Sequence, residues 1–184
     1  MNVIEVSNRI LEDLRDIVNQ VDESQAEALM KEIRQADKIF VAAAGRSFLM
    51  MKAFAMRLMH MGLKVYVVGE TVTPAIGPED LLIVGSGSGG TATIKVMAEK
   101  AKKIGARMAL LTIYEESAMA QMADTLLIVP AATNQVAAGK SSWQPGGSSF
   151  EQSLLILLDA VVFVLSEELS LGLTKGLSLH ANLE

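Results

Sequence analysis

Hydrophobic and polar residues follow a helical period at the start of the chain. Over residues 3–21 apolar side chains recur every three to four positions, with charged residues between them, which predicts an amphipathic helix. A second segment of this kind ends near residue 35. It follows Asp22 and Gln25, a pair that resembles a helix-start box. We therefore expect two helices within residues 1–36.

Short apolar segments typical of buried strands follow, and helical patterns separate them. The five predicted strands are residues 38–43, 63–68, 81–84, 107–113 and 125–129. The predicted helices between them are residues 47–61, 91–104 and 117–123. Methionines and other apolar residues cover most of the circumference of the first of these helices, which predicts burial on two sides. Strands that alternate with helices favour an α/β fold, with a five-stranded parallel sheet flanked by helices on both faces.

The last third of the chain begins with a long irregular segment. Residues 130–149 are mostly small and polar, and long loops in compact domains are often functional, so we expect a possible lid. Residues 150–184 follow as an apolar helix and a tail. Glu151 and Asp159 interrupt the apolar run, which predicts a buried or interface helix and not a membrane span. We expect residues 1–184 to form a single domain.

Composition narrows the classes of function. The 184 residues carry a formal charge of −5 without a basic cluster, which argues against nucleic-acid binding. The chain has no cysteine, and His60 and His180 are far apart in sequence, so neither a disulfide framework nor a structural zinc is expected. The N-terminal segment lacks the basic start and apolar block of a signal peptide, which favours a cytoplasmic protein that does not enter a membrane.

A glycine- and serine-rich segment, residues 86–91, connects a predicted strand to a predicted helix. Unpaired N–H groups and the helix dipole favour an anion at a helix start. Glycines allow close approach of the backbone, and the hydroxyls of Ser86, Ser88 and Thr91 add donors. The segment has neither P-loop nor dinucleotide spacing, so it indicates a compact phosphate ester. A plain helix-capping turn is the alternative interpretation.

Ligands of parallel sheets bind at the carboxyl ends of the strands, where we expect the loops carrying Arg46, Glu70 and Ser86 to converge. Each candidate also has a structural interpretation. Arg46 suits either phosphate binding or an ion pair with Asp159 or another acid, and Glu70 suits a strand end. Glu151 lies in the first turn of its helix, where a carboxylate is favoured by the dipole alone.

Several motifs, taken in order, extend these observations over nearly the full length. They are Gly45-Arg46-Ser47, residues 54–62, Val68-Gly69-Glu70-Thr71, Ser86-Gly87-Ser88-Gly89 with Thr91, Gln144-Pro145, Phe150-Glu151-Gln152 and residues 180–184. With these motifs the chain resembles the sugar isomerase (SIS) family of phosphosugar-binding domains, and within it the 6-phospho-3-hexuloisomerase group. The resemblance implies a flavodoxin-like three-layer sandwich. It also implies a homotetramer with sites between subunits, and no cofactor or metal.

The implied reaction converts D-arabino-hex-3-ulose 6-phosphate to D-fructose 6-phosphate, a step of formaldehyde fixation in the ribulose monophosphate pathway. A carbonyl moves between adjacent carbons through an enediolate, so a carboxylate suits the carbon-to-carbon proton transfer and a histidine suits proton exchange between the oxygens. By the resemblance Glu151 is the base and His180, reaching in from a neighbouring chain, is the acid or shuttle.

By the same resemblance, the phosphate ligands are Ser47, Ser86, Ser88 and Thr91, helped by the N–H groups of residues 87–90. Arg46 and Glu70 line the site. The chain departs from the family pattern at Phe48 and Gly90, which leaves its sugar preference open. Two alternatives also stay open: a phosphosugar sensor without catalysis, and an isomerase of another sugar phosphate.

Overall fold

The fold is built on one parallel β-sheet. The computed structural model describes residues 1–132, 143–169 and 179–182. Five strands lie in the order β2-β1-β3-β4-β5, and every neighbouring pair is parallel. Their bounds are β1 Ile39–Ala43, β2 Val65–Val67, β3 Leu81–Gly85, β4 Arg107–Thr112 and β5 Thr125–Ile128. The predicted five-stranded parallel sheet is therefore confirmed.

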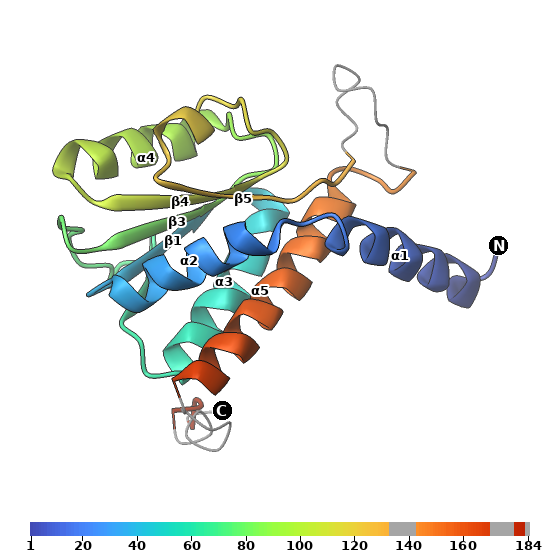
Figure 1. The fold of residues 1–184 in the computed structure, drawn as a ribbon, viewed down its shortest axis with the longest axis horizontal. Helices are drawn as coiled ribbons and strands as arrows, with labels where there is room; N and C mark the ends of the chain where they lie inside the picture. Colours follow the sequence, from blue (N-terminus) through green and yellow to red (C-terminus); the bar gives the residue numbers. More distant parts are fainter. Residues whose placement is uncertain (133–142, 170–178, 183–184) are drawn as a thin grey trace.

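Helices cover both faces of this sheet (Figure 1). They are α1 Val3–Val18, α2 Glu23–Gln35, α3 Gly45–His60, α4 Ala92–Ile104 and α5 Ser148–Glu168, with a 3₁₀ turn, η1, at Ala120–Met122. Alternate strand residues point to opposite faces. Val41 and Ile83 accordingly pack with α2, α3 and α5, whereas Phe40 and Leu82 pack with α4 and η1. The three-layer sandwich expected from the sequence is confirmed.

The N-terminal helices begin as their sequences suggest, with one difference. Asn2 and Glu5 form a reciprocal capping box at the start of α1. The Asp22 carboxylate accepts the Ser24 N–H and caps α2. The expected helix-start box is only half formed, because the side-chain oxygen of Gln25 accepts the N–H of Ile128 at 2.8 Å and so ties α2 to β5.

Two elements are half as long as predicted or less. The strand expected at 63–68 pairs only over Val65–Val67, on the edge of the sheet. The helix expected at 117–123 is only the turn η1, because the Ser117 side chain accepts the Ala120 N–H and fills a gap beside the 86–91 loop. Local hydrogen bonds by serine compete with a continuing helix.

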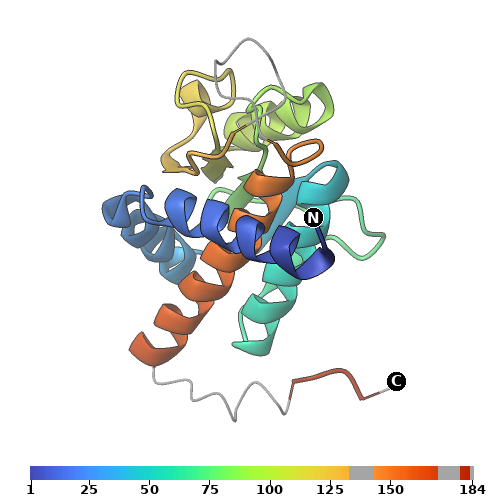
Figure 2. The same ribbon diagram turned by 90° about the vertical axis from the view of Figure 1, so that its right-hand side faces the viewer.

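Helix α5 is the most apolar element. It is long and apolar enough to pass a length-and-composition test for a membrane span, but 44% of the tested window is buried inside the protein. It runs along α3 and contacts α1 and α2 (Figure 2). Leu154 and Leu158 are almost completely buried there. These contacts are those of a core helix, as predicted.

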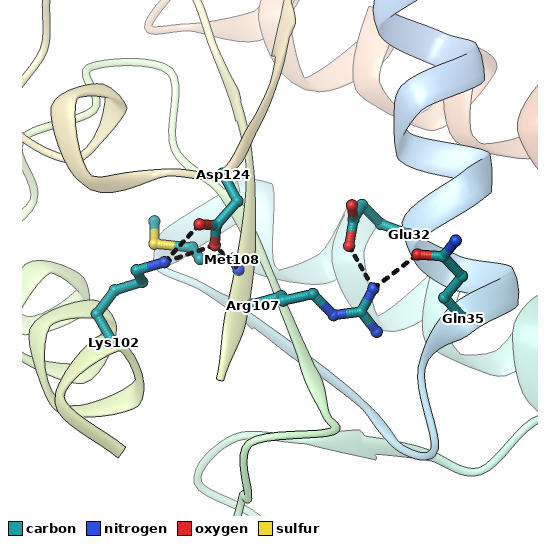
Figure 3. A network of polar contacts seen from close by, with 6 residues as sticks. All are labelled: Glu32, Gln35, Lys102, Arg107, Met108 and Asp124. Atoms are coloured by element: carbon teal, nitrogen blue, oxygen red, sulfur yellow. Dashed lines mark hydrogen bonds and ion pairs between the residues drawn. The ribbon is translucent and has the colours of Figure 1, made fainter. Parts of the chain in front are cut away.

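Charged side chains hold the amino-terminal end of the sheet together (Figure 3). Arg107, the first residue of β4, donates to Glu32 at 2.7 Å and to Gln35 at 3.1 Å on α2. Asp124 accepts the N–H of Met108 at 2.7 Å and pairs with Lys102 of α4. These contacts join both helical layers to β4 and β5 at the end away from the glycine-rich loop.

Candidate functional site

The glycine-rich loop lies where the direction of the chain through the sheet reverses. From β1 the chain moves outward to β2, and it then returns to β3 on the other side of β1. Ala43 of β1 is in register with Gly85 of β3, so both strands end at the same level. Open parallel sheets bind ligands in the crevice at such a switch point. The segments that follow, residues 44–47 and 86–91, both lie at this edge.

The loop over residues 86–91 presents unpaired donors. Within the described part of the chain, the backbone N–H groups of Gly87, Ser88 and Thr91 form no hydrogen bond, and neither do those in the first turn of α4. The hydroxyls of Ser86 and Thr91 lie 3.4 Å apart. These groups together match the needs of a phosphate, which accepts several hydrogen bonds through its oxygens.

Residues after β4 support this loop. The N–H of Ile113 donates to the Gly87 carbonyl, and the N–H of Met119 donates to the Gly89 carbonyl, both at 3.1 Å. Gly89 has φ of +58°, and a Cβ there would lie 2.0 Å from the Ser117 hydroxyl. Only glycine suits this position. The sequence did not predict this supporting role of Ser117 and its loop, since no motif links them to residues 86–91.

The helices differ in how their starts are capped. The helices α1 and α2 carry side-chain caps, whereas α3, α4 and α5 begin without a side-chain cap bond. Thr91 is a common capping residue, yet it leaves α4 uncapped. The uncapped N–H groups and the dipoles of three helices therefore favour negative charge at the switch-point edge.

Arg46 joins two of these helix starts. Its Nη1 donates to the Ser148 hydroxyl of α5 at 2.8 Å, and its Nε lies 3.4 Å from the Glu151 carboxylate. The Glu151 side chain is 15% exposed, so its carboxylate is largely sheltered from water. The alternative pairing of Arg46 with Asp159 is wrong, because Asp159 pairs with Arg57 at 3.7 Å. Arg46 therefore contacts the predicted base itself.

The start of α5 also contacts the glycine-rich loop. The ring of Phe150 lies 3.2 Å from the position that a Cβ on Gly87 would occupy. Glu151 is the next residue in the first turn of α5. The fold thus brings Arg46, Glu151 and the 86–91 loop to one place. Ser47 lies beside Arg46 in the first turn of α3 and is half-buried.

Glu70 lies further out, after the edge strand β2. Its carboxylate accepts a hydrogen bond from Lys52 of α3 at 2.7 Å, and about half of its side chain is exposed. The Lys52 ammonium also lies over the Phe48 ring, 4.8 Å from its centroid. Within the described residues, no direct contact joins Glu70 to Glu151 or to the 86–91 loop.

His180 is not part of this group within one chain. Its ring stacks on His60 at the far end of α3, with centroids 5.1 Å apart. At 1.5 Å per residue, Gly45 and His60 are about 22 Å apart along that helix. Partial burial, together with the charges of His180 and Arg57, lowers the pKa of His60 below its usual 6.5.

The structure also has a cavity away from this edge. A cavity of about 340 Å³ lies between α4 and residues 73–76, but its lining is mainly apolar, with Lys100 as the charged member. It does not suit a phosphosugar, whose hydroxyls need polar partners.

The described residues hold no cluster of three or more His, Asp or Glu side chains that would bind a metal. Residues 133–142, the central half of the expected lid at 130–149, lie outside the described residues, and α5 begins at Ser148.

Comparison with known proteins agrees with this architecture. Residues 32–156 match the family model of the SIS domain. A 3-hexulose-6-phosphate isomerase of Bacillus subtilis is 40% identical over 185 residues, covering 100% of both chains. One of Mycobacterium gastri is 42% identical over 175 residues, covering 95% of this chain and 88% of its own.

Solved structures give the same result. The fold matches a protein of Methanococcus jannaschii, for which a molecular function of 3-hexulose-6-phosphate isomerase has been inferred, with a TM-score of 0.81 and 35% identity over 97% of each chain. The match to the family model, together with sequence identity at this level over whole chains, shows that the chain belongs to the SIS domain family.

Proposed function

We propose that this protein isomerises D-arabino-hex-3-ulose 6-phosphate to D-fructose 6-phosphate. The observation that carries the proposal is the sheltered Glu151 carboxylate, which lies beside uncapped helix starts and a loop of free N–H donors. That combination provides a base next to an anion site. Relatives similar over their full length are named 3-hexulose-6-phosphate isomerases, which supports the choice of substrate.

The phosphate is proposed to bind at residues 86–91. The hydroxyls of Ser86, Ser88 and Thr91 and the N–H groups of Gly87 and of the first turn of α4 surround the space in front of α4. Ser47 completes this set from α3, and Glu70 lines the outer rim. An anion here gains hydrogen bonds that water otherwise supplies, and it is stabilised by the dipole of α4.

Glu151 then acts on the carbon skeleton. The carboxylate removes the proton from C2 of the 3-ketose, and the electrons move into a C2–C3 double bond while the C3 oxygen takes a proton. Loss of the proton on the C2 oxygen and return of the first proton to C3 give the 2-ketose. Arg46 holds Glu151 in place and adds positive charge near the enediolate, which lowers the barrier through electrostatic stabilisation.

His180 is proposed to move the proton between the two oxygens, in the site of a neighbouring subunit. The distance along α3 favours this arrangement, because His180 of the same chain lies at the opposite end of that helix. Apolar side chains left exposed on α3 and α5, such as Leu49, Met56 and Phe163, support a homotetramer that covers them. The burial of α3 on two sides, expected from its sequence, would then be completed by contacts between chains.

Purified protein should form fructose 6-phosphate from the 3-hexulose phosphate in a coupled assay, without added metal or nucleotide. A small panel of pentose, heptose and other hexose phosphates tests the substrate preference that Phe48 and Gly90 leave open. If another sugar phosphate of the panel is turned over faster than the 3-hexulose phosphate, it would replace the proposed substrate. Binding without turnover across the panel would favour a sensor. We place the activity in the cytoplasm, because a charged phosphosugar does not cross a bilayer unaided.

A further inference from the structure

Helix α1 lies outside residues 32–156, the segment that matches the family model, and the structure connects it to the catalytic centre. We propose that Asp13 of α1 is a positioning residue for Glu151. It would act through the segment that leads into α5, by a chain of polar contacts that ends at the pair of Arg46 and Glu151. The inference rests on the proposed isomerase function, in which Glu151 is the base.

The first contact fixes the segment before α5 against α1. The side-chain amide of Gln144 donates to the Asp13 carboxylate at 2.9 Å, and Gln144 is only 3% exposed. The neighbouring residue Trp143 supports the same attachment, since the Arg9 guanidinium of α1 lies over its ring, 4.2 Å from the centroid. A hydrogen bond to a carboxylate is stronger than one between neutral groups, so this contact defines where the segment sits.

The second part of the chain runs through Ser148. Its hydroxyl donates to the Pro145 carbonyl at 2.6 Å and accepts from Arg46 Nη1 at 2.8 Å. A hydroxyl has one proton and two lone pairs, so both bonds form together and each orients the other. Arg46 Nε also lies 3.4 Å from the Glu151 carboxylate. The position of residues 143–145 therefore influences the position of this carboxylate through Ser148 and Arg46.

The substrate-binding loop is not part of this chain of contacts. Residues 86–91 are held by the segment after β4 and by Phe150, not by α1. Loss of the Asp13 contact should therefore move the base without weakening the phosphate site. Since a displacement of about 1 Å can cost up to about 100-fold in rate, we expect kcat to fall roughly tenfold and KM to stay within about twofold.

Three variants of α1 test the role. Asp13→Ala removes the acceptor and should show the loss of kcat. Asp13→Asn keeps an oxygen that accepts from Gln144 and should restore kcat to near the wild-type value. Asp16→Ala is the matched control, because it removes the same charge from an exposed position whose carboxylate bonds to no described residue. If Asp13→Ala does not fold, Gln144→Glu breaks the same contact by placing two carboxylates together.

A second readout does not depend on activity. Trp143 is the single tryptophan of the chain, so quenching of its fluorescence by acrylamide reports on this segment alone. Quenching should increase in Asp13→Ala and not in Asp13→Asn or Asp16→Ala. Unchanged kcat in Asp13→Ala, or an equal loss in Asp13→Asn, would overturn the positioning role while wild-type activity still supports the function. A wild-type protein that turns over no sugar phosphate would overturn the function and this role with it.

Discussion

At the scale of single residues, Glu151 shows how position gives a common side chain a specific task. A carboxylate in the first turn of a helix is often only a favourable partner for the dipole. Here it is largely sheltered and lies 3.4 Å from Arg46, at the edge where two parallel strands end. The contact with Arg46 fixes its direction, which a capping role alone would not require.

Glu151→Gln should lower kcat by about 10² to 10⁴, because the amide keeps the shape of the carboxylate but cannot accept the proton. Affinity for fructose 6-phosphate, measured by calorimetry, should stay close to wild type. Glu167→Gln at the exposed end of α5 is the control. Wild-type turnover by Glu151→Gln would remove Glu151 from the mechanism.

Adjacent glycines give a second test at this scale. Gly89→Ala should raise KM at least about tenfold, because a Cβ would overlap Ser117 and because alanine costs about 1–2 kcal/mol in the left-handed region. Gly90→Ala is the control, since its Cβ would meet only the Ser88 carbonyl oxygen, at 3.8 Å. Steady-state kinetics on both variants makes the comparison. Equal KM values would show that the shape of the loop does not matter for binding.

At the scale of elements, α3 connects two regions with different chemistry. Its start carries Arg46 at the proposed site, and its end carries His60 against His180 of the tail. Helix α5 packs against α3 and also begins at the site, with Glu151 in its first turn. The length of α3 thus separates Glu151 from His180 of the same chain.

The stacked histidines predict a pH dependence. The pKa of His60 is below 6.5 through burial and through the charges of His180 and Arg57. Protonation is therefore easier when the tail is released, so the contact should be stable above pH 6.5 and weaken as the pH falls below that value. In an NMR titration, His180→Ala should raise the pKa of His60. An unchanged His60 titration in that variant would rule out the stack in solution.

At the scale of the whole molecule, the described chain leaves apolar surface uncovered. Phe163 and Ile156 on α5 are 56% and 43% exposed, and Leu49 on α3 is 60% exposed. Side chains of this size are costly to leave in water when they lie together. The proposed homotetramer would bury them.

Phe163→Glu should therefore lower the mass measured by light scattering, since it places a charge in the proposed contact. Val96→Glu on α4, a residue 63% exposed on the other side of the sheet, is the control and should leave the mass unchanged. Activity should fall with the mass if His180 acts in the neighbouring site. A wild-type mass equal to one chain of 19.7 kDa would contradict the shared site.

The parallel sheet and the glycine-rich loop could be predicted from the amino-acid sequence. Apolar segments with strand length and helical periods between them left few alternatives to a parallel α/β fold, because such strands must be covered on both faces. Gly89 and its neighbours indicated an anion site because their chemistry is local. The limits of η1 and β2 were less predictable, since Ser117 and the sheet edge decide them through contacts distant in sequence.

Contacts between residues distant in the sequence became visible only in the folded chain. No spacing relates Arg46 to Glu151, Asp13 to Gln144 or His60 to His180, because each pair is brought together by the packing of α3, α5 and α1 and by the tail. The sequence offered Arg46 two kinds of partner, and geometry selected the base. Hydrophobic periodicity specifies the elements, whereas ion pairs between them depend on how those elements pack.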